Sequence, residues 1–491
     1  MQCNKIEEYL QVIDETIAKG PFQADWASLG QHKTPQWYRK GRFGLFIHWG
    51  VYSVPAYASE WYPRLMYLKG SPAYLHHKKV YGGVEKFPYK NFVPQFKAEK
   101  FNADEWLDIF QKSGAKYIMP VGEHHDGFKM YKSSLNRWNA AEMGPHRDVL
   151  QELHEACDRH GIGFCTSSHR AEHYWFLNGA RDFDCDITRG EDADFYGPAH
   201  REGTGNKARY SCGETMQPDE AWLRDWLASS AELIDRNRPL AVYFDWWVTQ
   251  KAFKPYMKKF LAYYYNRAAE WGKEVTVFYK MDGIAKGCAT FDVERGQLDT
   301  VSPDIWQSDT AIAKNSWGYT EGNKFKTAAE IACAMTDVVS KNGCFMLNVG
   351  PKADGTICEE EKQVLLQLGQ WLENCGEAIY DAQPFDVFGE SKKKRKNGSF
   401  KENFKYTPAD IRFTYQPGCI YMFVLNAGSG STYASKTLAR GNDAASYMIR
   451  RITLLGSDAK VTYTRSKKAL ALTVHGSYDR HMPLCFKIEL G

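Results

Sequence analysis

The sequence has no long apolar run: no stretch approaches the roughly 20 consecutive apolar residues that a membrane-spanning helix needs. Residues 1–9 carry acids where a signal peptide would be basic and then apolar. The sequence also has little excess charge, because 63 basic residues are nearly balanced by 59 acidic ones. We therefore expect a cytoplasmic protein that binds neither membranes nor nucleic acids.

Motifs for metals and cofactors are also missing. The 12 cysteines form no C-x-x-C pair, the histidines form no H-E-x-x-H, and no G-x-G-x-x-G follows a strand-like run. The first two patterns are typical of zinc sites and the third of dinucleotide binding. His124 and His125 are adjacent, so on an extended chain their side chains point in different directions and suit substrate hydroxyls better than one ion. We predict no metal and no cofactor.

Aromatic residues, by contrast, are abundant. They make up 14% of the 491 residues, and the 15 tryptophans exceed what an average core requires. Flat rings pack well on the apolar C–H faces of sugars, so this composition favours a carbohydrate-binding surface. The chain is also longer than one compact core usually allows, which predicts two domains.

Most of the chain alternates short apolar runs with segments of helical periodicity. Helices are predicted at 103–114, 149–160, 220–236, 254–271, 327–341 and 359–380, and the intervening runs are predicted strands, with a short one at 304–306. Both a closed barrel and a doubly wound sheet fit this alternation of helices and parallel strands. We favour a (β/α)8-like TIM-type barrel, because polar clusters follow several strands, at His48, Glu123–Asp126, Ser168–Arg170, Asp245 and Asn348.

Beyond residue 381 the pattern changes to short alternating runs separated by Gly, Ser and Asp turns. This texture predicts a small antiparallel β-sandwich. We therefore expect a catalytic barrel domain at 1–381 and a C-terminal β-sandwich domain at 382–491. The sandwich would pack against the barrel and could lend one loop to its site.

Two carboxylates are candidates for chemistry. Asp245 ends the apolar run 240–247 between aromatic residues, where an ionised acid costs several kcal/mol unless it is paired or hydrogen-bonded. It is therefore either a helix cap or an acid kept for catalysis. A glycosidase needs a second acid across the scissile bond, and the candidate is Glu294, a predicted loop carboxylate that follows a glycine-rich stretch. An ordinary ion pair between Glu294 and Arg295 is the alternative.

Seven short motifs, in the same order along residues 37–352, resemble those of the α-L-fucosidases of glycoside hydrolase family twenty-nine. They are F-I-H-W-G from Phe46, S-E-W-Y from Ser59, G-E-H-H-D-G-F from Gly122, Y-F-D-W-W from Tyr243, E-R-G from Glu294, S-W-G-Y from Ser316 and L-N-V-G-P from Leu347. The barrel followed by a β-sandwich is also the arrangement of that family.

The resemblance implies a retaining, exo-acting hydrolase that releases terminal α-L-fucose from oligosaccharides or glycoconjugates. It assigns Asp245 as the nucleophile and Glu294 as the acid/base. The substrate-binding positions that it implies are His48, Trp49, Glu60, Trp61, His124, His125, Tyr243, Lys280 and Trp317. The histidines would bind fucose hydroxyls, and Trp317 would cover the apolar face that bears the fucose methyl group.

The chain departs from the family pattern at three places. Lys280 stands where many members have an arginine, and 166–170 replaces a stretch that often carries tyrosines. Gln307 stands where the branch specific for branched fucosides has its acid, which favours Glu294 in that role and a broader substrate range. A binding module that has lost its chemistry and a hydrolase of another deoxy or galacto-configured sugar stay open. Nothing in the sequence fixes the oligomeric state, and a homo-oligomer is compatible with it.

Overall fold

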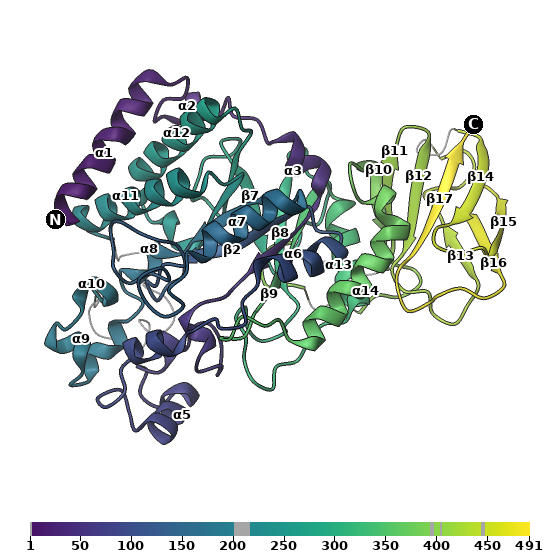
Figure 1. The fold of residues 1–491 in the computed structure, drawn as a ribbon. Coiled ribbons are helices and arrows are strands. Elements are labelled where there is room, and N and C mark those ends of the chain that lie inside the picture. Colours follow the sequence, from purple (N-terminus) through teal and green to yellow (C-terminus); the bar gives the residue numbers. More distant parts are fainter. Residues whose placement is uncertain (1, 201–216, 393–396, 403–404, 443–446) are drawn as a thin grey trace.

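The computed structural model describes residues 2–200, 217–392, 397–402, 405–442 and 447–491. Parallel strands covered by helices occupy most of the chain, and two antiparallel sheets lie at the opposite end of the molecule (Figure 1). In the described residues, no helix is both long and apolar enough to cross a membrane.

The parallel strands close into the predicted barrel. The strand order is β1-β9-β8-β7-β6-β5-β4-β2-β3, and a further parallel pairing of β1 with β2 closes the sheet. The short segments β3 and β4 both pair with β2 and act as one interrupted strand, which makes the barrel eight-fold. The strands are β1 Phe43–Ile47, β2 Tyr117–Glu123, β3 Gly163–Phe164, β4 Thr166–Ser168, β5 Ala241–Phe244, β6 Thr276–Tyr279, β7 Thr290–Glu294, β8 Trp306–Ala311 and β9 Gly343–Val349.

The helices that cover the barrel begin and end at recognisable signals. Asn102 accepts the backbone N–H groups of the first turn of α6, and Gly161 ends α7 in the left-handed conformation with φ of 65°. Thr327 and Glu330 form a capping box at the start of α13. The covering helices are α6 Ala103–Lys112, α7 Val149–His160, α11 Glu220–Asn237, α12 Phe253–Trp271, α13 Ala328–Val339 and α14 Glu359–Cys375.

Helix α1 (Gln2–Lys19) was not predicted. It lies against α11 and α12 at the edge of the barrel (Figure 1) and is largely exposed. Among its residues with described side chains, Ile13 and Ile17 are the buried ones, so the apolar stripe is too narrow to stand out among the polar residues around it.

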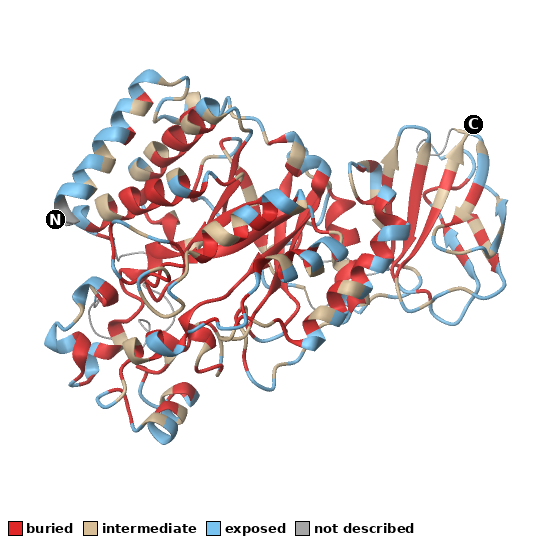
Figure 2. Cartoon of the chain, viewed as in Figure 1, coloured by how far each residue is buried: buried red, intermediate tan, exposed pale blue. Residues whose placement is uncertain are grey.

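The barrel strands are buried on both faces, as Figure 2 shows in red. Inside the barrel, the strands contribute a core that includes Phe46, Met119, Tyr243, Phe278 and Met346. A separate and larger core fills the space between strands and helices. Two apolar layers explain why the strands read as continuous apolar runs without alternation.

Strands β7 and β8 differ from the prediction. Glu294 was expected in a loop, but it is the last residue of β7. The short strand expected at 304–306 instead begins at Trp306 and continues to Ala311. Its sequence, W-Q-S-D-T-A, is polar and yet fully buried, because several of these side chains point into the barrel and are hydrogen-bonded there. Buried polarity hides a strand from a search for apolar runs.

The C-terminal part forms the predicted antiparallel sandwich. A five-stranded sheet has the order β10-β11-β12-β17-β14, and a three-stranded sheet has the order β13-β16-β15. The strands are β10 Gln383–Glu390, β11 Ile411–Gln416, β12 Cys419–Val424, β13 Thr432–Ser435, β14 Ile449–Leu454, β15 Lys460–Arg465, β16 Leu470–His475 and β17 Leu484–Leu490. An apolar core of its own lies between the two sheets.

The other face of the five-stranded sheet packs on the barrel. Tyr421 and Phe423 of β12 belong to the apolar cluster of the helices rather than to the sandwich core. Trp371 of α14 lies 6.3 Å from the ring of Phe423 and donates its indole N–H to the carbonyl of Pro483 at 3.0 Å. The sandwich is thus fixed to the barrel by apolar packing.

Candidate active site

A pocket of about 530 Å³ opens at the carboxyl ends of the barrel strands. The chain brings polar groups there because parallel strands all end at the same face of a barrel. Its lining is formed by Phe46, His48, Glu60, Trp61, His124, His125, His169, Tyr243, Asp245, Trp246, Lys280, Met281, Phe291, Asp292, Glu294, Asp309, Trp317, Ser399 and Phe400.

Asp245 follows β5 and is surrounded by donors. One carboxylate oxygen, Oδ1, accepts the backbone N–H of Trp246 at 2.8 Å and lies 3.1 Å from the ammonium of Lys280. The other, Oδ2, lies 3.5 Å from Nε2 of His125 and 3.5 Å from Nδ1 of His169. Burial favours the neutral acid, but Lys280 and the two imidazoles outweigh it and hold the pKa of Asp245 well below 3.8. Asp245 is therefore an anion that also caps the turn after β5.

Glu294 contacts the same lysine but has different surroundings. Lys280 donates to its Oε2, which makes one buried ammonium a bridge between the two carboxyl groups. Burial raises the pKa of Glu294 to about 7. Lys280 lowers this pKa, but the nearby charges of Asp309 and Asp245 raise it and so counteract the lysine. Arg295 instead directs its guanidinium to Glu402, with Nη1 3.0 Å from Oε1. Glu294 can hold a proton near neutral pH.

Two further acids, Asp292 and Asp309, lie in the barrel interior behind Glu294. Gln307 donates to Oδ1 of Asp292 at 2.8 Å, and the hydroxyl of Tyr243 donates to Oδ2 of Asp309 at 3.1 Å. Among the described residues, the remaining oxygen of each acid has no hydrogen-bond donor. Burial raises the pKa of both. The charge of Asp309 adds to burial in raising the pKa of Asp292, so the pair does not readily carry two negative charges.

Four imidazoles form the floor of the pocket. His48 follows β1, His124 and His125 follow β2, and His169 follows β4. Nδ1 of His48 lies 2.6 Å from Oδ1 of Asn348, which accepts its proton and leaves Nε2 as a free acceptor. Burial lowers the pKa of His48 and His124 well below 6.5 and that of His125 to about 4. These neutral rings can bind vicinal hydroxyls of a sugar as donors or acceptors.

The same rings could hold a metal ion. His48, His124 and His169 have ligand atoms within 4.8 Å of one another, and so do His125, His169 and Asp245. Neutral imidazoles are common ligands of transition metals. Both sets include atoms that also suit sugar hydroxyls, so the geometry is compatible with either ligand.

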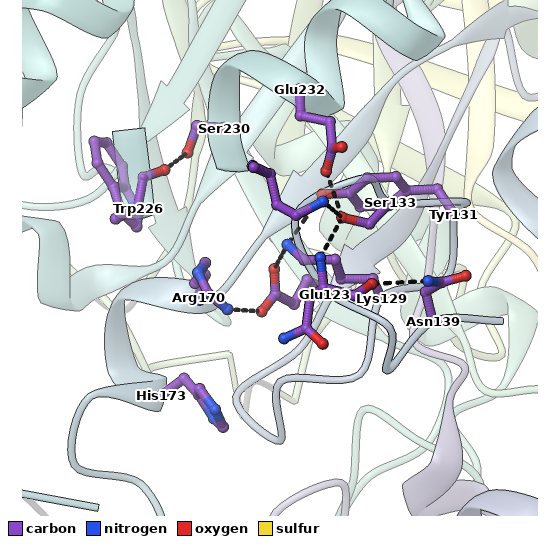
Figure 3. Close-up of polar contacts among 12 residues, drawn as sticks. Glu123, Lys129, Tyr131, Ser133, Asn139, Arg170, His173, Trp226, Ser230 and Glu232 are labelled. Atoms are coloured by element: carbon purple, nitrogen blue, oxygen red, sulfur yellow. Dashed lines mark hydrogen bonds and ion pairs between the residues drawn. The ribbon is translucent and has the colours of Figure 1, made fainter. Parts of the chain in front are cut away.

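A buried network fixes the two turns that carry the histidines (Figure 3). Glu123 lies directly before His124, and Arg170 lies directly after His169. The carboxylate of Glu123 binds the guanidinium of Arg170 and, through Oε2, the ammonium of Lys129 at 2.6 Å. This pairing compensates the buried charges and holds the ends of β2 and β4 in one arrangement.

Glu172 lies behind His125, on the side away from Asp245. Its Oε1 accepts the backbone N–H of Trp247 at 3.1 Å, and its Oε2 lies 3.5 Å from Nδ1 of His125. The Glu172 side chain is fully buried, and burial with the nearby charge of Asp245 raises its pKa to about 8. Glu172, His125 and Asp245 thus form a carboxyl–imidazole–carboxylate row, with 3.5 Å separations that are longer than an ordinary hydrogen bond.

Trp317, which also lines the pocket, is held by its neighbours. Oε2 of Glu60 accepts the hydroxyl of Ser316 at 3.0 Å and the backbone N–H of Trp317 at 2.8 Å. Asn348 donates its amide to the Trp317 carbonyl at 2.6 Å, and the guanidinium of Arg295 lies 4.7 Å from the Trp317 ring centroid. The indole is therefore held as an apolar part of the pocket lining.

Of the residues assigned to the site from the sequence, Trp49 is the one that the structure does not bring to the pocket. Its ring packs on Phe96, Phe101 and Trp106 behind the barrel, and its indole N–H donates to the carbonyl of Lys352 at 2.7 Å. The reason is the alternation of an extended chain, since His48 points inward and its neighbour must point outward.

Several pocket residues were missed from the sequence: His169, Met281, Asp292, Asp309 and Phe400 line the pocket, and Glu172 supports it. The departure from the family at 166–170 was a signal for His169. No signal was available for Phe400, which comes from the C-terminal part of the chain.

Comparisons with known proteins show which family the chain resembles. A family model described as Alpha-L-fucosidase matches residues 9–377. Tissue alpha-L-fucosidase of Rattus norvegicus is 31% identical over 389 residues, which cover 77% of this chain and 76% of that protein. Plasma alpha-L-fucosidase of Homo sapiens is 31% identical over 395 residues, which cover 76% and 77%. The crystal structure of Thermotoga maritima alpha-fucosidase has a TM-score of 0.75 and 27% identity, and covers 95% of this chain and 100% of that one.

Proposed function

The chain belongs to the alpha-L-fucosidase family, and from that premise we propose that it removes terminal α-L-fucose from oligosaccharides or glycoconjugates with retention of configuration. The pocket is of a size that suits one sugar, and its two carboxyl groups, Asp245 and Glu294, are 12% and 14% exposed, as expected for a glycosidase of this family. The observation that carries the mechanism is the contact of both Asp245 and Glu294 with the ammonium of Lys280.

That shared contact limits the distance between the carboxylates. Two oxygens that bind one nitrogen lie no more than the sum of two hydrogen-bond lengths apart, about 6 Å. Retaining glycosidases have their carboxyl groups about 5 Å apart, whereas inverting enzymes need about 6.5–9.5 Å to admit a water molecule between the general base and the sugar. The arrangement here supports double displacement.

In the first displacement, the carboxylate of Asp245 attacks the anomeric carbon of fucose. Glu294 donates its proton to the glycosidic oxygen as the bond to the leaving group breaks, so a covalent fucosyl-enzyme and a free alcohol are formed. The charge states support these roles: Asp245 is held ionised, and Glu294 can carry a proton near neutral pH.

In the second displacement, the ionised Glu294 removes a proton from water, and the water oxygen attacks the anomeric carbon. The bond to Asp245 breaks, fucose is released, and both carboxyl groups return to their starting states. Two inversions give net retention.

The remaining pocket residues support binding of one terminal sugar. The histidine floor presents ring nitrogens to hydroxyl groups, and Trp317 presents an apolar surface. The solved structures similar to this chain include Thermotoga maritima alpha-fucosidase in complex with fucose, at 26% identity. A closed floor favours a chain end over an internal sugar, which is the basis of the exo assignment.

The test is hydrolysis of p-nitrophenyl α-L-fucoside, with p-nitrophenyl α-D-galactoside, whose ring hydroxyls have the mirror-image arrangement, as the control substrate. We expect release of nitrophenol from the fucoside at a rate at least about 100-fold higher, since the histidine floor binds specific hydroxyls. Proton NMR of the first-formed sugar should show α-L-fucose. Initial formation of β-L-fucose would disprove retention, and preference for the galactoside would disprove the assigned sugar.

A further inference from the structure

Two large apolar side chains stand exposed at the mouth of the pocket. Phe400 is 69% exposed and Met281 is 58% exposed, although both line the pocket. They come from separate parts of the chain: Met281 follows Lys280 at the end of β6, and Phe400 belongs to the loop 397–402 of the C-terminal part. Apolar surface exposed beside a binding pocket commonly contacts a ligand.

The loop that carries Phe400 is fixed to the end of β7. Backbone N–H groups of Gly398, Phe400 and Lys401 donate to the carbonyls of Gln297, Glu294 and Arg295 at 2.9, 2.9 and 2.8 Å. A Cβ atom at Gly296 would lie 2.1 Å from the carbonyl oxygen of Gly398, so the E-R-G glycine is needed for this close approach.

Glu402 anchors the far end of the same loop. Its carboxylate binds Nη1 of Arg295 at 3.0 Å, Nζ of Lys326 at 2.8 Å, and the hydroxyl of Thr310. Phe400 therefore projects from a backbone held on both sides.

Both exposed residues adopt an unfavourable backbone conformation. The φ angles of Met281 and Phe400 are +50° and +57°, in the left-handed region that residues with side chains rarely occupy. A fixed loop and two left-handed residues thus keep apolar side chains in solvent rather than in the core. Such an arrangement is consistent with a surface that is covered when a ligand binds.

The position of Phe400 indicates which part of the ligand it meets. Its backbone is bonded to Glu294, the proposed proton donor to the leaving group. Residues next to a general acid, on its solvent side, face the leaving group rather than the sugar held in the pocket. Phe400 also lines a second cavity of about 770 Å³, which shares Glu60 and Trp317 with the first.

We propose that Phe400 and Met281 form a leaving-group subsite, in which the sugar that carries the fucose packs the apolar face of its ring on these side chains. This inference rests on the proposed function and specifies its substrate class. The leaving group is an oligosaccharide of two or more residues, because the second cavity continues from Phe400 toward Tyr406. A small aglycone would leave that cavity empty.

The test compares a substrate that has no leaving-group sugar with substrates that have one. α-L-Fucosyl fluoride occupies only the pocket, whereas 2′-fucosyllactose and 3-fucosyllactose present a disaccharide leaving group. For the Phe400→Ala variant, we expect kcat/KM to fall about tenfold on the better fucosyllactose, through loss of one aromatic contact, and less than twofold on the fluoride. Phe400→Trp should restore activity on the fucosyllactose, and Met281→Ala should show the same pattern more weakly.

Met448→Ala is the matched control, because Met448 is 75% exposed and lies away from the pocket. It should leave both activities unchanged. Equal losses on both substrates for Phe400→Ala, or no loss on either, would overturn the subsite. So would a wild type that hydrolyses the fluoride and neither fucosyllactose. A wild type inactive on the fluoride would instead overturn the proposed function.

Discussion

Asp245 and Glu294 both contact the ammonium of Lys280, but the surroundings of these two carboxyl groups differ. On one side, Asp245 is surrounded by a backbone N–H and two imidazoles, and its pKa lies well below 3.8. On the other side, Glu294 lies among further carboxyl groups, and its pKa is raised to about 7. Since both contact the same ammonium, the neighbours beyond the lysine decide which acid keeps a proton. One cation can therefore serve two opposite protonation states.

The largest expected effect comes from removing the carboxyl group of Asp245. Asp245→Ala should lower kcat on p-nitrophenyl α-L-fucoside by about 10⁴-fold or more, the scale seen when a nucleophile is removed. Glu294→Ala should cost about 10²-fold, because nitrophenolate needs little protonation to leave. Added azide should then rescue both variants.

The anomeric configuration of the azide products identifies which acid is the nucleophile and which is the acid/base. Asp245→Ala should give β-L-fucosyl azide by a single inversion, whereas Glu294→Ala should give α-L-fucosyl azide through the covalent intermediate. NMR of the products decides, and interchanged anomers would reverse the assignment of the two acids.

Removing the bridge should change both sides together. Lys280 lowers the pKa of both Asp245 and Glu294, so Lys280→Met raises both. Asp245 acts when ionised and Glu294 when protonated, so both limbs of the pH profile of kcat/KM should move to higher pH. The loss at pH 6 should be about 10²-fold, the scale of a lost charge-assisted pairing. Lys280→Arg keeps the charge and should retain a profile close to that of the wild type. Limbs that stay in place would show that the lysine does not set the two protonation states.

Substitution of Glu172 should affect the surroundings of Asp245 without changing those of Glu294. Glu172→Gln removes the carboxyl group behind His125 while keeping its size, and we expect kcat/KM to fall by no more than about tenfold, the scale of one polar contact. The matched control is Glu232→Gln, because Glu232 is equally buried but binds Ser133 and Ser134 away from the pocket. Equal losses in the two variants would mean that Glu172 acts only on stability.

The smallest effect should come from the Glu294 side. In the wild type, kcat/KM should fall tenfold per pH unit above about pH 7, as Glu294 loses the proton that it must donate. Asp309→Asn removes a neighbouring charge that raises the pKa of Glu294, so this alkaline limb should move to lower pH by less than one unit. The pH profile checks it, and an upward shift would contradict the role of Asp309.

Sequence reasoning predicted the barrel because its strands and helices have distinct apolar patterns. It located the carboxylate at the end of β5 for the same reason, since a single acid after an apolar run is conspicuous. It missed the extent of β8, whose buried polar side chains imitate a loop. Glu172 was also missed, because a charged residue in a short helix reads as solvated until the fold shows that it is fully buried.

Contacts between distant segments could not be predicted from the sequence for a simpler reason. Phe400 lies more than 100 residues beyond Glu294, and nothing in the local sequence of either predicts that their backbones meet. The order of strands in a barrel follows from chain connectivity, but the docking of a second domain does not.

Because Gly296 and Gly398 approach closely, the barrel and the C-terminal part of the chain together form the pocket. A nascent chain that contains only the proposed catalytic domain, 1–381, has both acids but lacks the wall beside Glu294. Recovery of full activity on a fucosyllactose during refolding would therefore report docking of the sandwich, whereas activity on the fluoride would report closure of the barrel. A sandwich transplanted from a relative would not restore the activity on a fucosyllactose unless it carried an equivalent loop.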